Sequence, residues 1–88
     1  MIVQLKLYGS SKILSNKDIL DIQLPNNSNI KNLRGVLTEM IDAKHSKSNL
    51  KSLAKTAAFF NSTNNIINDN YKLKDDELIS IIPPIGGG

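Results

Sequence analysis

The chain has no cysteine, no tryptophan and a single histidine among its 88 residues. The absence of cysteine excludes a disulfide framework, a thiolate metal site and a cysteine nucleophile, and His45 alone cannot form a histidine-rich metal site. No run approaches the ~18 consecutive apolar residues of a membrane-spanning helix. The first residues lack the pattern of a signal or transit peptide, so we expect a cytoplasmic protein with no membrane partner.

The composition is that of an ordinary folded domain. Hydrophobic residues make up 40% and charged residues 22% of the chain, and the net charge is +3. A chain of this length forms one domain with a modest core. We therefore expect no deep active-site cleft.

Several segments show the period of two that is typical of half-buried strands. Near the beginning, Val3, Leu5 and Leu7 alternate with polar residues. The last such segment is almost entirely apolar, which predicts a central strand. The predicted strands are Ile2–Tyr8, Ile19–Leu24, Thr56–Asn61, Ile66–Ile67 and Leu78–Ile82.

Apolar residues at spacings of three and four predict one long amphipathic helix. It opens at Ile30 after Asn29, a good N-cap residue, and its buried stripe continues through Leu33 and Leu37. Gly35 inside the helix is expected to cost about 1 kcal/mol relative to alanine. A short helical turn is expected within residues 45–54.

The order of these elements predicts an α+β fold. Pairing the first and last strands, the two most hydrophobic, buries the most apolar surface, and the helix then crosses one face of the sheet. This is the β-grasp arrangement, a mixed sheet of four to five strands with one main helix across one face. We expect this domain to cover residues 1–82 and an extended tail to cover residues 83–88.

The tail carries the chemistry. Pro83 and Pro84 stop the last strand and favour an extended path, and the sequence then ends in three glycines. Glycine has no Cβ, so this segment is as thin as a polypeptide can be and suits a partner's narrow channel. The reactive group is the carboxylate of Gly88, which ATP can convert to an acyl adenylate. Sulfur can then replace AMP to give a thiocarboxylate, a soft nucleophile by the logic of thiolates.

The ending resembles the MoaD family, the small subunit of molybdopterin synthase, whose chains finish Pro-Pro-x-x-Gly-Gly. Pro83, Pro84, Gly87 and Gly88 match this pattern. The segment from Leu73 to Ile79 resembles the family's Leu-x-Asp-Gly-Asp-Glu-Val turn and strand. Asp76 stands there where the family usually has glycine.

The resemblance implies a sulfur carrier that binds no cofactor of its own. A MoeB-like activating enzyme would use ATP to adenylate Gly88, and a sulfurtransferase would supply the sulfur. The tail would then enter a MoaE-like large subunit, in a heterotetramer, and donate sulfur to a cyclic pyranopterin phosphate to build molybdopterin. Gly88 with Gly87 would take part in the reaction, and the partner-binding residues would be Ile82, Pro83, Pro84, Ile85 and Gly86.

Two related functions share this tail chemistry and stay open. One is a sulfur carrier for thiamine or tRNA thiolation, resembling ThiS, and the other is a ubiquitin-like modifier joined to lysines of other proteins. Phe59 or Phe60 are weaker candidates for the partner interface, with core packing as their main expected role.

Two further classes are less well supported by the residues. No spacing of Ser, His and acidic residues forms a nucleophile–base set, which argues against a self-contained enzyme. The acidic run from Asp75 to Glu77 fits a solvated turn better than a metal site. The four lysines that could share a face have no stacking aromatics among them, which argues against a nucleic-acid partner; they are Lys44, Lys47, Lys51 and Lys55.

Overall fold

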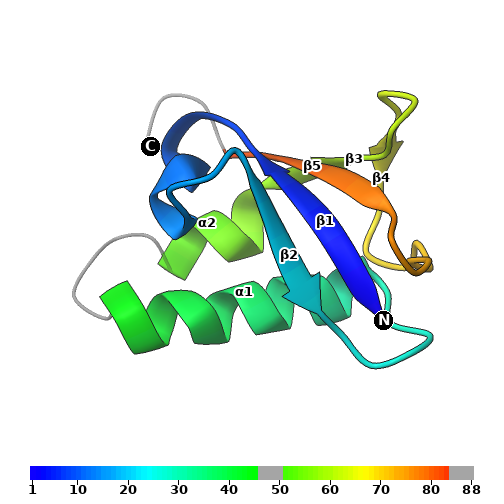
Figure 1. Cartoon of the computed structure of the whole chain (residues 1–88), viewed down its shortest axis with the longest axis horizontal. Coiled ribbons are helices and arrows are strands. Elements are labelled where there is room, and N and C mark those ends of the chain that lie inside the picture. The colour runs from blue at the N-terminus through cyan, green and yellow to red at the C-terminus, as the bar shows by residue number, and fades with distance from the viewer. Residues whose placement is uncertain (46–50, 84–88) are drawn as a thin grey trace.

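Five strands form one mixed sheet in the computed structural model, which describes residues 1–45 and 51–83. The strand order across the sheet is β2-β1-β5-β3-β4, and α1 crosses one face (Figure 1). The elements are β1 (Ile2–Leu7), the 3₁₀ helix η1 (Gly9–Leu14), β2 (Ile19–Gln23), α1 (Ile30–His45), α2 (Lys51–Thr56), β3 (Ala58–Phe60), β4 (Ile66–Ile67) and β5 (Leu78–Ile82).

The first and last strands lie side by side at the centre of the sheet, as the sequence predicts. β1 and β5 pair in parallel with Leu5 opposite Ile79, and β5 also pairs antiparallel with β3. Ile79 and Ile81 are fully buried. The β-grasp prediction is thus confirmed, with five strands and the most apolar one in the middle.

The N-terminus of α1 is closed by side chains and by a loop from later in the chain. Asn29 accepts a hydrogen bond from the Asn32 amide, and the Asn32 side chain accepts one from the Asn29 amide, both at 2.9 Å. This reciprocal pair is a capping box. The amides of Ile30 and Lys31 donate to the carbonyls of Tyr71 and Asp69, at 3.1 Å each. The predicted cap at Asn29 is confirmed, and the helix start is joined to the loop before β5.

The core fills the space between α1 and the sheet. The predicted stripe of the helix is fully buried against residues of β1, β5 and β3, including Phe59. Each strand contributes alternate residues to this face, so the intervening residues lie on the opposite, open face of the sheet. The helix stripe comprises Ile30, Leu33, Leu37 and Ile41.

The third strand begins later than predicted. The sequence pattern suggests a strand from Thr56, but Thr56 is the last residue of α2, where its hydroxyl donates to the Ser52 carbonyl. The amide of Ala57 also bonds back to the Leu53 carbonyl. These bonds extend the helical turn, and the strand starts only at Ala58.

Positive backbone φ angles explain two asparagines and one aspartate. Asn27, Asn64 and Asp76 have φ angles of 67°, 63° and 63°, a region that asparagine and aspartate tolerate better than most residues. Gly35 behaves differently, because a Cβ built there meets no atom within 4 Å. The helix therefore tolerates this glycine without needing it for close approach to the sheet.

Candidate functional site

Ile82 and Pro83, at the end of the central strand β5, are the point at which the predicted tail begins; we call them the tail root. β5 ends at Ile82, and Pro83, which lacks the amide hydrogen a ladder needs, follows it. Ile81 is buried in the core, whereas Ile82 is 37% exposed on the open face of the sheet. Pro83 is half-buried and is the last residue that the structure describes. The other predicted site residues, Pro84, Ile85, Gly86, Gly87 and Gly88, lie outside the described residues.

The turn after β1 lies against this root. Gly9 has a φ of 56°, and a Cβ built on it would be 3.3 Å from Cγ of Pro83. Tyr8, which precedes Gly9, is bonded to Ser11, two residues after it: the amide of Tyr8 donates to Ser11 Oγ at 2.8 Å, and that hydroxyl donates to the Tyr8 carbonyl. Ser11 is fully buried. The first and last parts of the described chain therefore meet at one point.

An apolar surface extends along the open face of the sheet from the tail root toward β4. Ile82 is opposite Ala58, and Phe60 is opposite Ile66. Tyr8 continues the alternation of β1 beyond Leu7, which pairs with Ile81, and so lies beside Ile82. We call this surface the open-face patch; it consists of Tyr8, Ala58, Phe60, Ile66 and Ile82.

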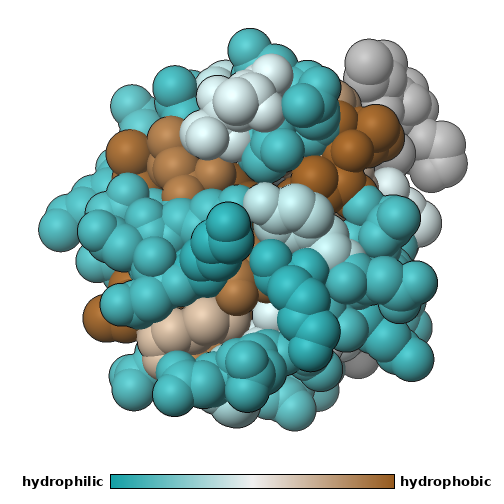
Figure 2. Space-filling view, turned by 90° about the vertical axis from the view of Figure 1, so that its right-hand side faces the viewer, coloured by the Kyte–Doolittle hydropathy of each residue, from teal (hydrophilic) through white to brown (hydrophobic). Residues whose placement is uncertain are grey.

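The most exposed members of the open-face patch are accessible to a partner. Ile66 is 69% exposed and Tyr8 is 39% exposed, and Lys6 Nζ lies 5.4 Å from the centre of the Tyr8 ring. Figure 2 shows brown apolar surface reaching solvent among teal polar loops at the end of the molecule that carries β4. Of the two phenylalanines, Phe59 is fully buried and Phe60 is half-buried in the patch.

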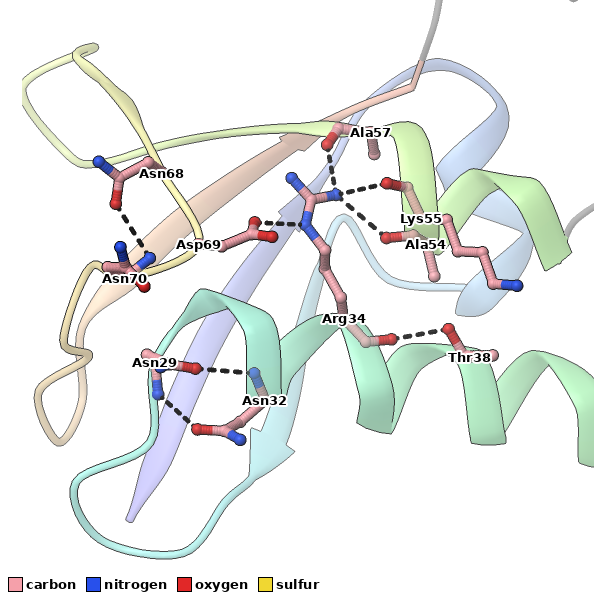
Figure 3. Close-up of polar contacts among 10 residues, drawn as sticks. All are labelled: Asn29, Asn32, Arg34, Thr38, Ala54, Lys55, Ala57, Asn68, Asp69 and Asn70. Atoms are coloured by element: carbon pink, nitrogen blue, oxygen red, sulfur yellow. Dashed lines mark hydrogen bonds and ion pairs between the residues drawn. The ribbon is translucent and has the colours of Figure 1, made fainter.

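Arg34 fixes the end of α2 beside β3. Its Nη1 donates to the carbonyls of Ala54, Lys55 and Ala57 at 3.1, 3.3 and 2.7 Å, and its Nε pairs with Asp69 at 2.8 Å (Figure 3). The guanidinium also lies 4.7 Å from the centre of the Phe59 ring. Arg34 therefore satisfies carbonyl groups at a helix C-terminus, where a cation is favoured.

The acidic run before β5 is a hydrogen-bonded turn. Asp75 accepts a bond from the Ile2 amide at 2.8 Å, and the Glu77 carboxylate accepts bonds from the Lys74 amide and the Tyr71 hydroxyl. The bond to Glu77, with burial and the nearby negative charge, raises the pKa of Tyr71 above its usual value. These carboxylates hold the start of β5 against β1. Within residues 1–45 and 51–83, no three His, Cys, Asp or Glu residues group as metal ligands.

Residues that periodicity did not single out make up much of this region. Gly9, Tyr8 and Arg34 were not predicted as site residues, although the alternation of β1 already places Tyr8 on the same face as Lys6. Of the four lysines that could share a face, only Lys55 has a described side chain, and it is exposed. In the described part of the chain no helix is long and apolar enough to cross a membrane.

Solved structures with the same fold include two groups of proteins. SAMP1, the small archaeal modifier protein 1 of Haloferax volcanii, is 11% identical with a TM-score of 0.70, and each chain covers 100% of the other. Subunit 1 of molybdopterin-converting factor from Helicobacter pylori, solved in complex with subunit 2, is 29% identical with a TM-score of 0.63 and 100% coverage of both chains.

A Pyrococcus furiosus protein described as molybdopterin converting factor subunit 1 is 20% identical, with a TM-score of 0.65. The alignment covers 96% of this chain and 98% of that one. No protein-family model and no curated protein matches the sequence. The structural likenesses extend over the whole domain, including the strand that leads into the tail.

Proposed function

Because this chain is MoaD-like, with a ubiquitin-like β-grasp fold, we propose that it is the sulfur-carrying small subunit of a molybdopterin synthase. The observation that carries the proposal is the position of the tail root. The central strand β5 leads directly into Pro83, and the sequence from there ends in the Pro-Pro-x-x-Gly-Gly pattern.

The proposed chemistry takes place at the carboxylate of Gly88. A MoeB-like enzyme joins this carboxylate to the α-phosphate of ATP, which releases pyrophosphate and leaves an acyl adenylate. The terminal sulfur of a persulfide on a sulfurtransferase attacks the acyl carbon and displaces AMP, which gives an acyl disulfide. A second thiol then attacks the sulfurtransferase sulfur, forms a disulfide with it and releases the thiocarboxylate of Gly88. Its sulfur then attacks a carbon of a cyclic pyranopterin phosphate bound by the large subunit and replaces an oxygen substituent there. Water cleaves the resulting acyl–sulfur bond, which leaves the sulfur on the pterin and regenerates the carboxylate of Gly88.

The open-face patch is the docking surface for the MoaE-like large subunit in this proposal. It is continuous with the tail root through Ile82, so one partner can cover the patch while it receives the tail. The Helicobacter pylori protein is solved as a complex of subunits 1 and 2, which supports a partner of this kind. The aromatic residues of the patch, Tyr8 and Phe60, are of the kind enriched at protein interfaces.

The chemical step is tested by mass spectrometry of the C-terminal peptide after incubation with ATP, an activating enzyme and a sulfur source. The expected product has one oxygen replaced by sulfur, and a variant that lacks Gly88 is the control. An unmodified carboxylate under conditions that thiolate a known carrier would refute the proposal. Conjugates to lysines of other proteins would identify a ubiquitin-like modifier instead.

The docking surface is tested with two isoleucines of similar exposure on the same face. Ile82 and Ile2 are 37% and 44% exposed, but Ile2 is the first residue of β1 and lies at the opposite end of the β1–β5 pair from Ile82. We expect Ile82→Ser to weaken binding of the large subunit about tenfold, equivalent to ~1.4 kcal/mol. Ile2→Ser should leave it unchanged. Equal effects of the two changes, measured by titration calorimetry, would contradict the assigned surface.

A further inference from the structure

The contact between Gly9 and Pro83 is close enough that a side chain at position 9 would displace the proline ring. A Cβ at position 9 would be 3.3 Å from Cγ and 3.8 Å from Cδ of Pro83. The shorter distance is tighter than ordinary van der Waals contact, so the proline ring would have to move. The φ of 56° independently favours glycine at this position. Glycine is therefore suited to position 9 by its conformation and by its lack of volume.

The turn that contains Gly9 is held in place and cannot easily yield. Ser11 is fully buried, and its hydroxyl is bonded to both the amide and the carbonyl of Tyr8. The amide of Ser11 also donates to the Tyr8 carbonyl at 3.1 Å, and the amide of Leu7 donates to the Asp18 carbonyl at 2.8 Å. Deforming the turn would break these bonds around the buried Ser11 hydroxyl, which is costly.

The strand before Pro83 is equally fixed. Ile81 is fully buried and is paired with Leu7 on one side and Phe59 on the other. With the turn and the strand both held, the ring of Pro83 is the movable group at this contact.

From this geometry we infer that the Tyr8–Ser11 turn is a positioning element for the tail and that Gly9 is the residue on which it depends. This inference rests on the proposed function, because direction matters only if Gly88 must reach a partner's site. Five residues follow Pro83, a reach of at most ~17 Å. A small rotation at Pro83 therefore moves the reactive group by several ångström, and misplacement of about 1 Å can slow a reaction ~100-fold.

The test compares two substitutions that each leave an alanine in the left-handed backbone region. Gly9→Ala and Asn27→Ala both place alanine at a positive φ, 56° and 67°, but Asn27 lies in the turn between β2 and α1, far from Pro83 in the sequence and the sheet. Both variants should lower the urea midpoint. We expect only Gly9→Ala to lower kcat for sulfur transfer about tenfold with the large subunit saturating, with KM changing little.

A second pair of variants separates the contact from general strain. In a protein that carries Pro83→Ala the proline ring is absent, so Gly9→Ala should lower kcat by a much smaller factor than it does when Pro83 is present. If Gly9→Ala lowered kcat by the same factor in both backgrounds, or by no more than Asn27→Ala does, the inference would be overturned. If Gly9→Ala does not fold, Gly9→Asn replaces it, because asparagine tolerates the positive φ yet still carries a Cβ.

A measurement that does not depend on sulfur-transfer activity separates this inference from the proposed function. A wild-type protein that cannot be thiolated refutes the proposed function, and amide chemical shifts then decide the positioning claim. Gly9→Ala should shift the amide signals of residues 85–88, whereas Asn27→Ala should not. Identical tail signals in wild type and Gly9→Ala would show that position 9 does not set the path of the tail.

Discussion

Replacing Arg34 by alanine tests how the sheet and the second helix are joined. The guanidinium donates to three carbonyl groups, stacks on Phe59 and pairs with Asp69. Hydrogen bonds to a charged group contribute about 1.5–3 kcal/mol, and a cation over an aromatic ring about 0.5–2 kcal/mol. The Asp69 side chain is 52% exposed, so the ion pair adds only ~0–1 kcal/mol.

These contributions are not fully additive, because water can replace part of the carbonyl bonding once the side chain is removed. The Arg34 side chain is itself 20% exposed. We therefore expect Arg34→Ala to lower the free energy of unfolding by about 2–4 kcal/mol. Arg34→Lys should lose much of the same free energy, because an ammonium group lacks the planar guanidinium that donates several hydrogen bonds and stacks on an aromatic ring.

Urea unfolding followed by far-UV circular dichroism measures these differences. Lys31→Ala, an exposed change on the same helix, is the control and should lie within about 0.5 kcal/mol of wild type. Asp69→Ala should lose less than about 1 kcal/mol. A loss as large for Asp69→Ala as for Arg34→Ala would refute the reasoning, because the ion pair rather than the carbonyl contacts would then be the main contribution.

Four other changes give expected outcomes from single features, each measured by urea unfolding. Gly35→Ala should stabilise the protein by about 1 kcal/mol, since the added methyl meets nothing within 4 Å; a destabilised variant would contradict the open surroundings. Asp76→Gly should stabilise the protein by roughly 0.5–1 kcal/mol. Glycine adopts the φ of 63° without strain, and this gain exceeds the additional conformational entropy that glycine loses on folding. Leu37→Ala, at a fully buried position, should cost about 2–5 kcal/mol. The raised pKa of Tyr71 predicts that its contribution to stability is fully present below the pKa of an unfolded tyrosine and is lost as the pH rises through the folded pKa. Tyr71→Phe should weaken this decline above about pH 10, and an unchanged decline would show that other groups cause it.

Local patterns in the sequence were sufficient for most of the fold. The alternation of Val3, Leu5 and Leu7 located β1, because one face of this sheet is buried and the other is open. Asn29 marked the helix start, since an asparagine side chain can accept a hydrogen bond from the amide of Asn32, which has no partner within the helix. The apolar character of residues 78–82 placed β5 at the centre of the sheet, because only a central strand is covered along both edges.

The contacts that shape the candidate site lie outside such patterns. Arg34 is on a partly exposed face of α1, and its acceptors are backbone carbonyls of another helix, which no periodicity can reveal. Gly9 and Pro83 come from opposite ends of the described chain. The start of β3 was misjudged because the bonds of Thr56 and Ala57 to the preceding turn outweigh the strand preference of the segment.

The central place of β5 has a consequence for synthesis on the ribosome. The two halves of the sheet, β2–β1 and β3–β4, are joined to each other only through β5 within the described sheet. While the nascent chain is still too short to include Leu78, these halves expose unpaired edges, and the core between them stays open. A product that stops before Leu78 cannot complete this sheet and is vulnerable to proteases. The domain can therefore complete its fold only in chains that have been synthesised as far as β5, the strand that leads into the tail.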